Sequence, residues 1–238
     1  MTTLDDEIRI VEEKNVVAQQ SSSEHGNIPQ VIAHAVPTKT QLYLMGIGYM
    51  LAMGVCGVVL VALGSTLDDL AAKCGTTSTK IGTVFVTRGI GAIIGALGSS
   101  KLYLWFQGNY VLTGSLTFLT ILLLCLPFNE SVAMLHILFL LLGVGTAVTD
   151  TGCQIMTRKL HGKTAGPWLG ANTVAFGISG ALVPLVEIIT TNLIAQYYVI
   201  CFFVLAVALF VYFGPNPESN GRLVGGTVTF DIKYGYQN

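Results

Sequence analysis

Long apolar stretches separated by short polar breaks fill most of this chain. They lie at about 41–66, 80–99, 110–128, 132–157, 166–190 and 195–214. A hydrocarbon core about 30 Å thick needs roughly 20 apolar residues in an α-helix to cross it. Because each stretch approaches that length, the pattern predicts an all-α membrane protein with a domain of six transmembrane helices over residues 39–214.

The segments on either side of this domain are polar. Residues 1–38 carry acidic residues and serines with little apolar surface, which predicts a disordered cytosolic tail. Residues 215–238 are polar and Gly-rich and predict a second cytosolic tail.

Basic loop residues set the orientation, because cytosolic loops carry an excess of Lys and Arg. Near the spans, the predicted outside holds Lys73 and Lys80, and the predicted inside holds six basic residues. Both termini are therefore predicted to be cytosolic, and we expect the plasma membrane rather than an organelle. The six inside residues are Lys39, Lys101, Arg158, Lys159, Lys163 and Arg222.

Composition supports the membrane prediction and excludes other classes. The chain is 52% hydrophobic and 11% charged, whereas a soluble domain of this size needs more charge to cover its surface. Its mean hydropathy is +0.67. The net charge is −1 without clustered Lys or Arg, so no nucleic-acid partner is expected. The five cysteines have no CxxC or Cys/His spacing, so no metal site is predicted.

The fourth stretch carries a polar face. Gly143, Thr146, Asp150, Gln154 and Thr157 are three or four residues apart and therefore share one side of a helix. A charge inside a span is costly, so Asp150 is predicted to be functional. The alternative is a structural hydrogen bond or ion pair.

The second and fifth stretches carry small-residue faces. In the second, Arg88 shares a side with the GxxxG pair Gly91 and Gly95, and Arg88 either contributes to a site or anchors helices. Small residues allow helices to approach closely in lipid, so Gly91, Gly95, Gly170 and Gly177 are predicted helix-packing residues. The fifth stretch carries Gly166, Gly170, Thr173, Gly177 and Gly180, with Asn172 adjacent.

The third and sixth stretches have no such face. They are almost unbroken bulky apolar sequence, which predicts that they lie at the periphery and face lipid on most sides.

An internal repeat is also indicated. At a constant offset of 81 residues, Gly64 matches Gly145 and Asp69 matches Asp150. Two copies of three spans have opposite orientations in the membrane, because three is odd. The sequence therefore predicts two inverted three-helix repeats, an arrangement found in transporters.

Several motifs resemble the major facilitator superfamily, and within it the sodium-dependent glucose transporter-like proteins and, more distantly, fucose permease. The run from Gly143 to Gln154, GVGTAVTDTGCQ, resembles the fourth-helix signature. The run from Leu63 to Leu70, LGSTLDDL, resembles the end of the first helix. Arg88-Gly-Ile-Gly91 with Lys101-Leu-Tyr103 resembles the second helix and its following loop, and Pro167-Trp168 through Pro184 resembles the fifth.

The resemblance implies one half of a superfamily fold, because members have two six-helix halves around a central cavity. It places Asp69 and Asp150 at acidic cavity positions and links the fourth-helix acid to Na⁺ or H⁺ coupling. The expected function is transport of a small polar solute, a sugar such as a hexose, by alternating access. The predicted substrate and ion-coupling residues are Asp69, Arg88, Thr146, Asp150, Gln154, Asn172 and Thr173.

Several alternatives remain open at this stage. The chain is expected to be an incomplete gene product, a half that dimerises, or a remnant with another role, and its possible partners are a second six-helix half or a second copy of itself. It could also be a truncated, non-transporting partner or regulator of a complete transporter. An enzyme is not expected, because GxSxG and HExxH are absent and the four histidines are scattered. The lipid bilayer is the expected environment, and no cofactor is expected beyond the coupling Na⁺ or H⁺.

Overall fold

The computed structural model describes residues 39–190 and 192–214, and the two predicted tails lie outside the described residues. The secondary structure elements of this part are all helical. Two short 3₁₀ turns, η1 (Leu126–Phe128) and η2 (Gly162–Thr164), follow α6 and α7. The α-helices are α2 (Lys39–Ser65), α3 (Leu67–Lys73), α4 (Ser78–Ile81), α5 (Val84–Trp105), α6 (Gly108–Cys125), α7 (Val132–His161), α8 (Ala165–Ala181), α9 (Val183–Ile189) and α10 (Leu193–Phe213).

Five segments of the described chain are long and apolar enough to cross a membrane, where the sequence predicted six. They are Thr40–Ser65, Thr79–Trp105, Gly108–Phe128, Val132–Ile189 and Leu193–Phe213. The fourth has 58 residues, and at about 1.5 Å per residue it is more than twice the thickness of a bilayer core. It contains two of the predicted spans, which accounts for the difference in the count.

The chain reverses direction inside this long segment. Gly162, the C-cap of α7, has a φ of 51°, a positive value that glycine adopts without strain. Beyond it, Trp168 stacks on His161 and Asn172 donates a hydrogen bond to Thr157. The later residue of α8 therefore contacts the earlier residue of α7, which shows that the two helices run antiparallel.

The predicted fifth span is broken, and the predicted loop before the second span is partly helical. Pro184 lies in the first turn of α9, where its missing N–H is tolerated but where it cannot continue the hydrogen-bond ladder of α8. The span at 166–190 is therefore two helices, α8 and α9. The loop before the second span contains α3 and α4, and α5 runs from Val84 to Trp105 instead of from 80 to 99.

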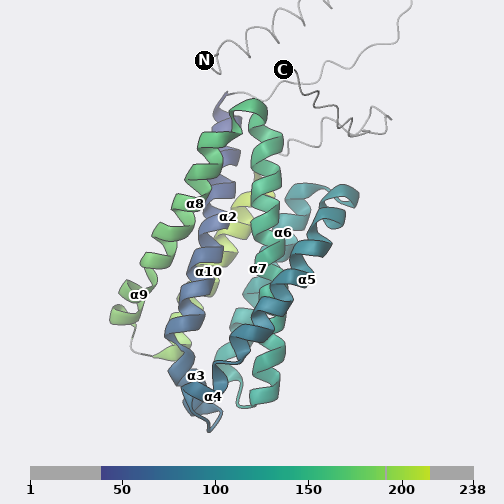
Figure 1. Cartoon of the computed structure of the whole chain (residues 1–238). Helices are drawn as coiled ribbons and strands as arrows, with labels where there is room; N and C mark the ends of the chain where they lie inside the picture. The colour runs from purple at the N-terminus through teal and green to yellow at the C-terminus, as the bar shows by residue number, and fades with distance from the viewer. Residues whose placement is uncertain (1–38, 191, 215–238) are drawn as a thin grey trace, which may run out of the picture.

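Six of these helices pack as three pairs: α5 with α7, α2 with α8, and α6 with α10 (Figure 1). The first residues of α2 and the last residues of α10 lie at the same end, since Gly48 packs against Phe210 and Val211. We call this the proximal end and the end that holds α3 and α4 the distal end. The turn between α7 and α8 is also proximal, because Trp168 packs against Gly46.

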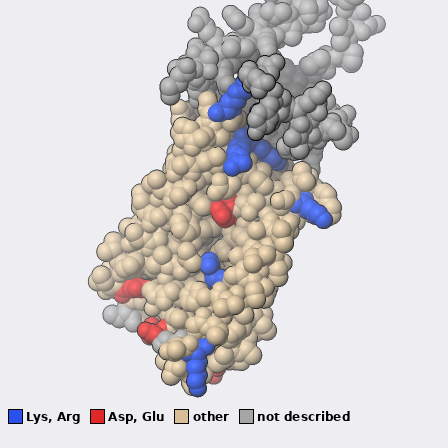
Figure 2. Space-filling view, viewed as in Figure 1, with Lys and Arg blue, Asp and Glu red and all other residues tan. Residues whose placement is uncertain are grey.

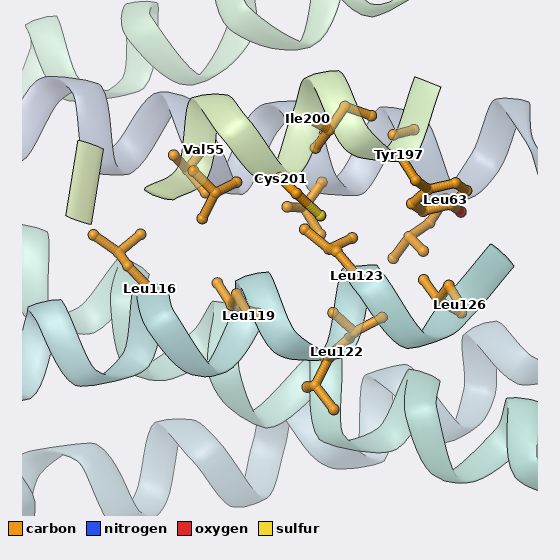
Figure 3. Close-up of a cluster of buried hydrophobic side chains, with 14 of the residues drawn as sticks. Val55, Leu63, Leu116, Leu119, Leu122, Leu123, Leu126, Tyr197, Ile200 and Cys201 are labelled. Carbon is orange, nitrogen blue, oxygen red and sulfur yellow. The ribbon is translucent and has the colours of Figure 1, made fainter. Parts of the chain in front are cut away.

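The apolar core lies between α2, α6, α7 and α10. Leu116, Leu119 and Leu123 of α6 point toward α10, with Ile200 and Cys201 opposite, whereas Leu122 points to the other side of α6 (Figure 3). Tyr197 is only 1% exposed. α6 and α10 therefore bury one side in this core, while large apolar side chains such as Ile121 and Phe202 are exposed on the other, so their predicted peripheral position stays a prediction. An unbroken apolar sequence has no face that distinguishes lipid from another helix, so its pattern could not show which of the two it contacts.

The outer surface is apolar along the middle and charged at the ends. Lys, Arg, Asp and Glu gather mainly toward the two ends of the face in Figure 2, with isolated charged side chains between. Large apolar side chains are exposed around the bundle, including Leu97 at 75% and Phe202 at 76%. Such a surface is stable against lipid and costly against water.

Candidate functional site

The site is built on the close contact between α5 and α7. A Cβ added to Gly91 would collide with the Leu140 carbonyl oxygen, and one added to Gly143 would collide with the Arg88 carbonyl oxygen. At Gly95 the added Cβ would lie 2.6 Å from the Val144 carbonyl oxygen. Gly91 and Gly95 therefore lie where α5 and α7 approach closely, and this contact positions Arg88 beside the polar face of α7.

The polar face of α7 meets two other helices. Near its middle, Cys56 Sγ of α2 donates a hydrogen bond to the Thr146 carbonyl oxygen at 3.7 Å. Nearer the proximal end, Asn172 Nδ2 of α8 donates to Thr157 Oγ1 at 2.9 Å. The Thr146 hydroxyl donates to the Leu142 carbonyl oxygen of its own helix at 2.8 Å. The stripe therefore runs along the seam between α2, α5, α7 and α8.

Asp150 and Arg88 lie in the central part of this seam without pairing. Gln154 follows Asp150 by one helical turn on the same side of α7, and both residues are half-buried. Since Arg88 lies opposite Gly143, the backbones of Arg88 and Asp150 are separated by about two helical turns, roughly 10 Å.

Several polar atoms of the seam are buried without a hydrogen-bond partner in the described part of the chain. They include Arg88 Nε, Asp150 Oδ1 and Asn172 Oδ1. Asn172 is only 1% exposed. A buried polar atom left unpaired costs about 1–3 kcal/mol, more when it is charged, so native proteins rarely leave one without a purpose. This cluster could donate to and accept from a polar ligand.

The structure does not bring every predicted residue to this seam. Asp69 is exposed on α3 at the distal end. Thr173 is exposed, and its hydroxyl donates to the Leu169 carbonyl oxygen of its own helix. An added Cβ at Gly170 or Gly177 would meet nothing within 4 Å in the described residues, so these glycines do not pack inside the bundle.

Sequence reasoning missed two polar residues and one packing position. His161 continues the α7 stripe four residues after Thr157, a spacing that the sequence already contained. Glu187, within the predicted fifth span, has a buried Oε1 without a partner in the described residues. Gly57 of α2 faces the Phe176 carbonyl oxygen of α8 so closely that a Cβ would collide with it. The position of Glu187 inside an apolar span could have been recognised from the sequence, whereas the packing role of an isolated glycine such as Gly57 could not.

Together, the apolar helical segments and the polar seam define a multi-pass α-helical membrane protein. No protein-family model matches the chain. It is similar to the sodium-dependent glucose transporter 1A of Mus musculus, with 26% identity over 129 residues that cover 54% of this chain and 30% of the mouse protein. The sodium-dependent glucose transporter 1 of Homo sapiens is 24% identical over 129 residues, which cover 54% of this chain and 25% of that protein.

A sodium-dependent glucose transporter 1 from Danio rerio is 26% identical over 130 residues, which cover 55% of this chain and 22% of that protein. The similarity is therefore distant, and the chain matches less than a third of the length of each relative. It agrees in kind with the resemblance found in the sequence.

Proposed function

We propose that this chain transports a small polar solute, a sugar of the hexose class, by alternating access. The observation that carries the proposal is the set of unpaired buried atoms along the seam, Arg88 Nε, Asp150 Oδ1 and Asn172 Oδ1. A hexose offers several hydroxyl groups, each able to donate and accept, which suits donors and acceptors of this kind. Gln154 and Thr146 lie on the same stripe, and the prediction for Thr173 and Asp69 stands as part of the proposal.

Asp150 is the proposed coupling residue. Its carboxylate lies in a seam surrounded by apolar helices, where a net charge is costly, so binding of H⁺ or Na⁺ favours the movement of the site between the two sides. An ion gradient can then drive the solute against its own gradient. Arg88 would contribute hydrogen bonds to the solute from its position two turns away.

We further propose that the two helix triplets are inverted repeats. The first triplet is α2, α5 and α6, and the second is α7, α8 and α10. When each helix is matched to its counterpart in order, the α5–α7 pair corresponds to the α8–α2 pair, and the α6–α10 pair corresponds to itself. This symmetry supports the repeat suggested by the 81-residue offset. In this proposal the proximal end is cytosolic, with both tails on that side of the plasma membrane, because Arg158, Lys159 and Lys163 lie there.

A second six-helix half or a second copy of this chain would complete the site. Gly170, Thr173 and Gly177 form an exposed stripe on α8 that touches no other described helix, and small residues permit close approach of a further helix. Cysteine at position 173 should then crosslink two copies of the chain, or the chain to another protein. Leu97→Cys, at an exposed position of α5, is the control, and equal crosslinking at both positions would contradict the proposal.

The transport proposal is tested by uptake of labelled hexoses into vesicles that contain this chain. Uptake is measured with and without inward Na⁺ or pH gradients. Asp150→Asn should abolish concentrative uptake while leaving insertion and helicity unchanged. Asp68→Asn, an exposed carboxylate on α3 outside the proposed site, should transport normally. Concentrative uptake by Asp150→Asn would refute the coupling role.

The second candidate is a non-transporting partner or regulator of a complete transporter. The observation that favours it is the coverage of only 22% to 30% of the relatives' lengths. In this case the position-173 crosslink forms with a different, larger membrane protein, and vesicles that contain the chain alone show no uptake under any gradient.

A further inference from the structure

His161 ends the polar stripe of α7 at the proximal end of the bundle. It is the last residue of α7 and is only 5% exposed. Its ring stacks on Trp168, with ring centroids 4.2 Å apart and an angle of 10° between the planes. Neither Nδ1 nor Nε2 has a hydrogen-bond partner in the described part of the chain. A buried imidazole with two unsatisfied nitrogens is uncommon and calls for a ligand or a proton.

The imidazole lies on the same side of α7 as Asp150. Asp150, Gln154, Thr157 and His161 are spaced by four, three and four residues, so they form one continuous row. Eleven residues separate the two titratable members, which corresponds to about 16 Å along the helix. Between them, Asn172 of α8 is bonded to Thr157 and keeps its buried Oδ1 unpaired.

We propose that His161 is a proton-exchange site that connects Asp150 with the aqueous phase at the proximal end, which makes H⁺ the coupling ion. This inference rests on the proposed transport function and deepens it. The protonated Asp150 carboxyl releases its proton through water held by Gln154, Thr157 and Asn172, and the lone pair of a His161 nitrogen accepts it. The resulting imidazolium then gives the proton to bulk water, and His161 returns to its neutral form.

The surroundings of His161 favour passage of a proton over its retention. The next residues, Gly162 and Lys163, are exposed, so the ring lies one residue from the aqueous phase. The charged groups of this turn are the exposed Arg158, Lys159 and Lys163, all positive, and they disfavour a lasting imidazolium. Trp168 of α8 acts in the opposite sense, because an indole face attracts a cation. From α2, the titratable Tyr43 packs on Trp168, with ring centroids 5.7 Å apart.

The alternative coupling ion fits this row less well. Na⁺ is a hard cation that prefers several oxygen ligands, whereas imidazole nitrogen is a good proton acceptor near neutral pH.

The fluorescence of Trp168 provides a test that needs no substrate. The chain has two tryptophans, so the full chain with Trp105→Phe reports on Trp168 alone. A stacked imidazolium quenches indole emission, whereas neutral imidazole quenches it little. The protein is reconstituted in one orientation into vesicles, and the pH is varied between about 4 and 9 on one side at a time, which brackets the ordinary titration of histidine.

We expect reversible quenching that follows the pH on the proximal side and not on the distal side. His161→Gln should abolish the pH dependence while retaining the helical circular dichroism spectrum. Asp150→Asn should move the midpoint to lower pH by roughly half to one pH unit, because it removes a negative charge about 16 Å away in a medium of intermediate polarity. Quenching that persists in His161→Gln, or that is absent from the parent protein, would overturn the proposal.

A final comparison separates this inference from the transport function. If Asp150 is required for uptake while His161→Gln retains full H⁺-coupled uptake, only the proton-exchange role is wrong. If His161 titrates from the proximal side but Asp150→Asn still concentrates the solute, the proposed coupling function is wrong instead.

Discussion

Replacing Gly95 with alanine tests whether α5 and α7 meet as closely as the structure indicates. The added Cβ would lie 2.6 Å from the Val144 carbonyl oxygen, whereas ordinary van der Waals contact begins at 3.4 Å. The two helices would have to separate locally by about 0.8 Å, the difference between these distances. A gap of that size forfeits about a quarter to a half of the dispersion energy of the contacts it opens.

The expected loss of stability is roughly 1–3 kcal/mol, as for other overpacked interiors. Gly98→Ala is the matched control, because it lies on the same helix and its added Cβ meets nothing within 4 Å. Both substitutions change the intrinsic helix propensity by the same amount, up to about 1 kcal/mol in favour of alanine. The difference between the two variants therefore isolates the effect of the contact.

The assay is thermal unfolding of each purified variant in one detergent, followed by circular dichroism. For chains of 150–250 residues, 1 kcal/mol corresponds to about 2–4 °C, so Gly95→Ala should unfold about 4–8 °C below Gly98→Ala if the contact contributes 2 kcal/mol. If the two variants unfold at the same temperature, α5 and α7 do not interlock through Gly95, and the placement of Arg88 beside the α7 stripe loses its support.

Three further predictions concern other parts of the bundle. Tyr49→Phe leaves buried Asn109 Oδ1 without the hydroxyl that donates to it at 2.8 Å, so the free energy of unfolding should fall by about 1–3 kcal/mol in the same assay, and an unchanged value would argue against this α2–α6 link. Pro184→Ala should let α8 continue into α9, seen as slower amide exchange at residues 182–186, with Pro167→Ala as a control that leaves this region unchanged. Partial burial and the Glu130 carboxylate raise the pKa of the Cys74 thiol. In a variant that keeps only Cys74, the rate of maleimide labelling from the distal side should therefore rise steadily above pH 8, because the thiolate is the reactive form. Glu130→Gln should increase the labelling rate near pH 8. Labelling of Cys74 from the proximal side would contradict the arrangement of the chain ends.

The sequence predicted the helices well because their signal is local. Length and hydropathy identified each long apolar stretch, and the three-or-four spacing of Thr146, Asp150 and Thr157 predicted one polar side of α7 that does lie along a seam. The break of the fifth span at Leu182 was not predicted, although Pro184, which cannot donate to the helical hydrogen-bond ladder, was a signal for it. The short helices α3 and α4 were not predicted, because a turn or two of helix in a polar connection has no hydrophobic period to reveal it.

Partner choice could not be predicted from spacing. Gly91 and Gly95 of α5 contact α7, whereas Gly170 and Gly177 of α8, which also share one side of their helix, contact no described helix. The residues that hold α8 against α2 are instead Gly54 and Gly57, which have no GxxxG spacing. A stripe of small residues shows that a helix can be approached closely, but it does not identify the neighbour. Only the three-dimensional structure shows which glycines contact another helix and which do not.

The exposed glycines of α8 and the unpaired polar atoms of the seam are independent observations, and both support the proposed half of a transporter. A small-residue face gives lipid chains little surface to contact, while it allows another helix to come near enough for many contacts. Unpaired buried atoms such as Asp150 Oδ1 and Asn172 Oδ1 are likewise stable only when something polar reaches them. One feature favours a protein neighbour at α8 and the other a polar ligand in the seam. Half of a transporter that encloses its solute together with a second half needs both features. A helix bundle that only resides in the lipid bilayer needs neither.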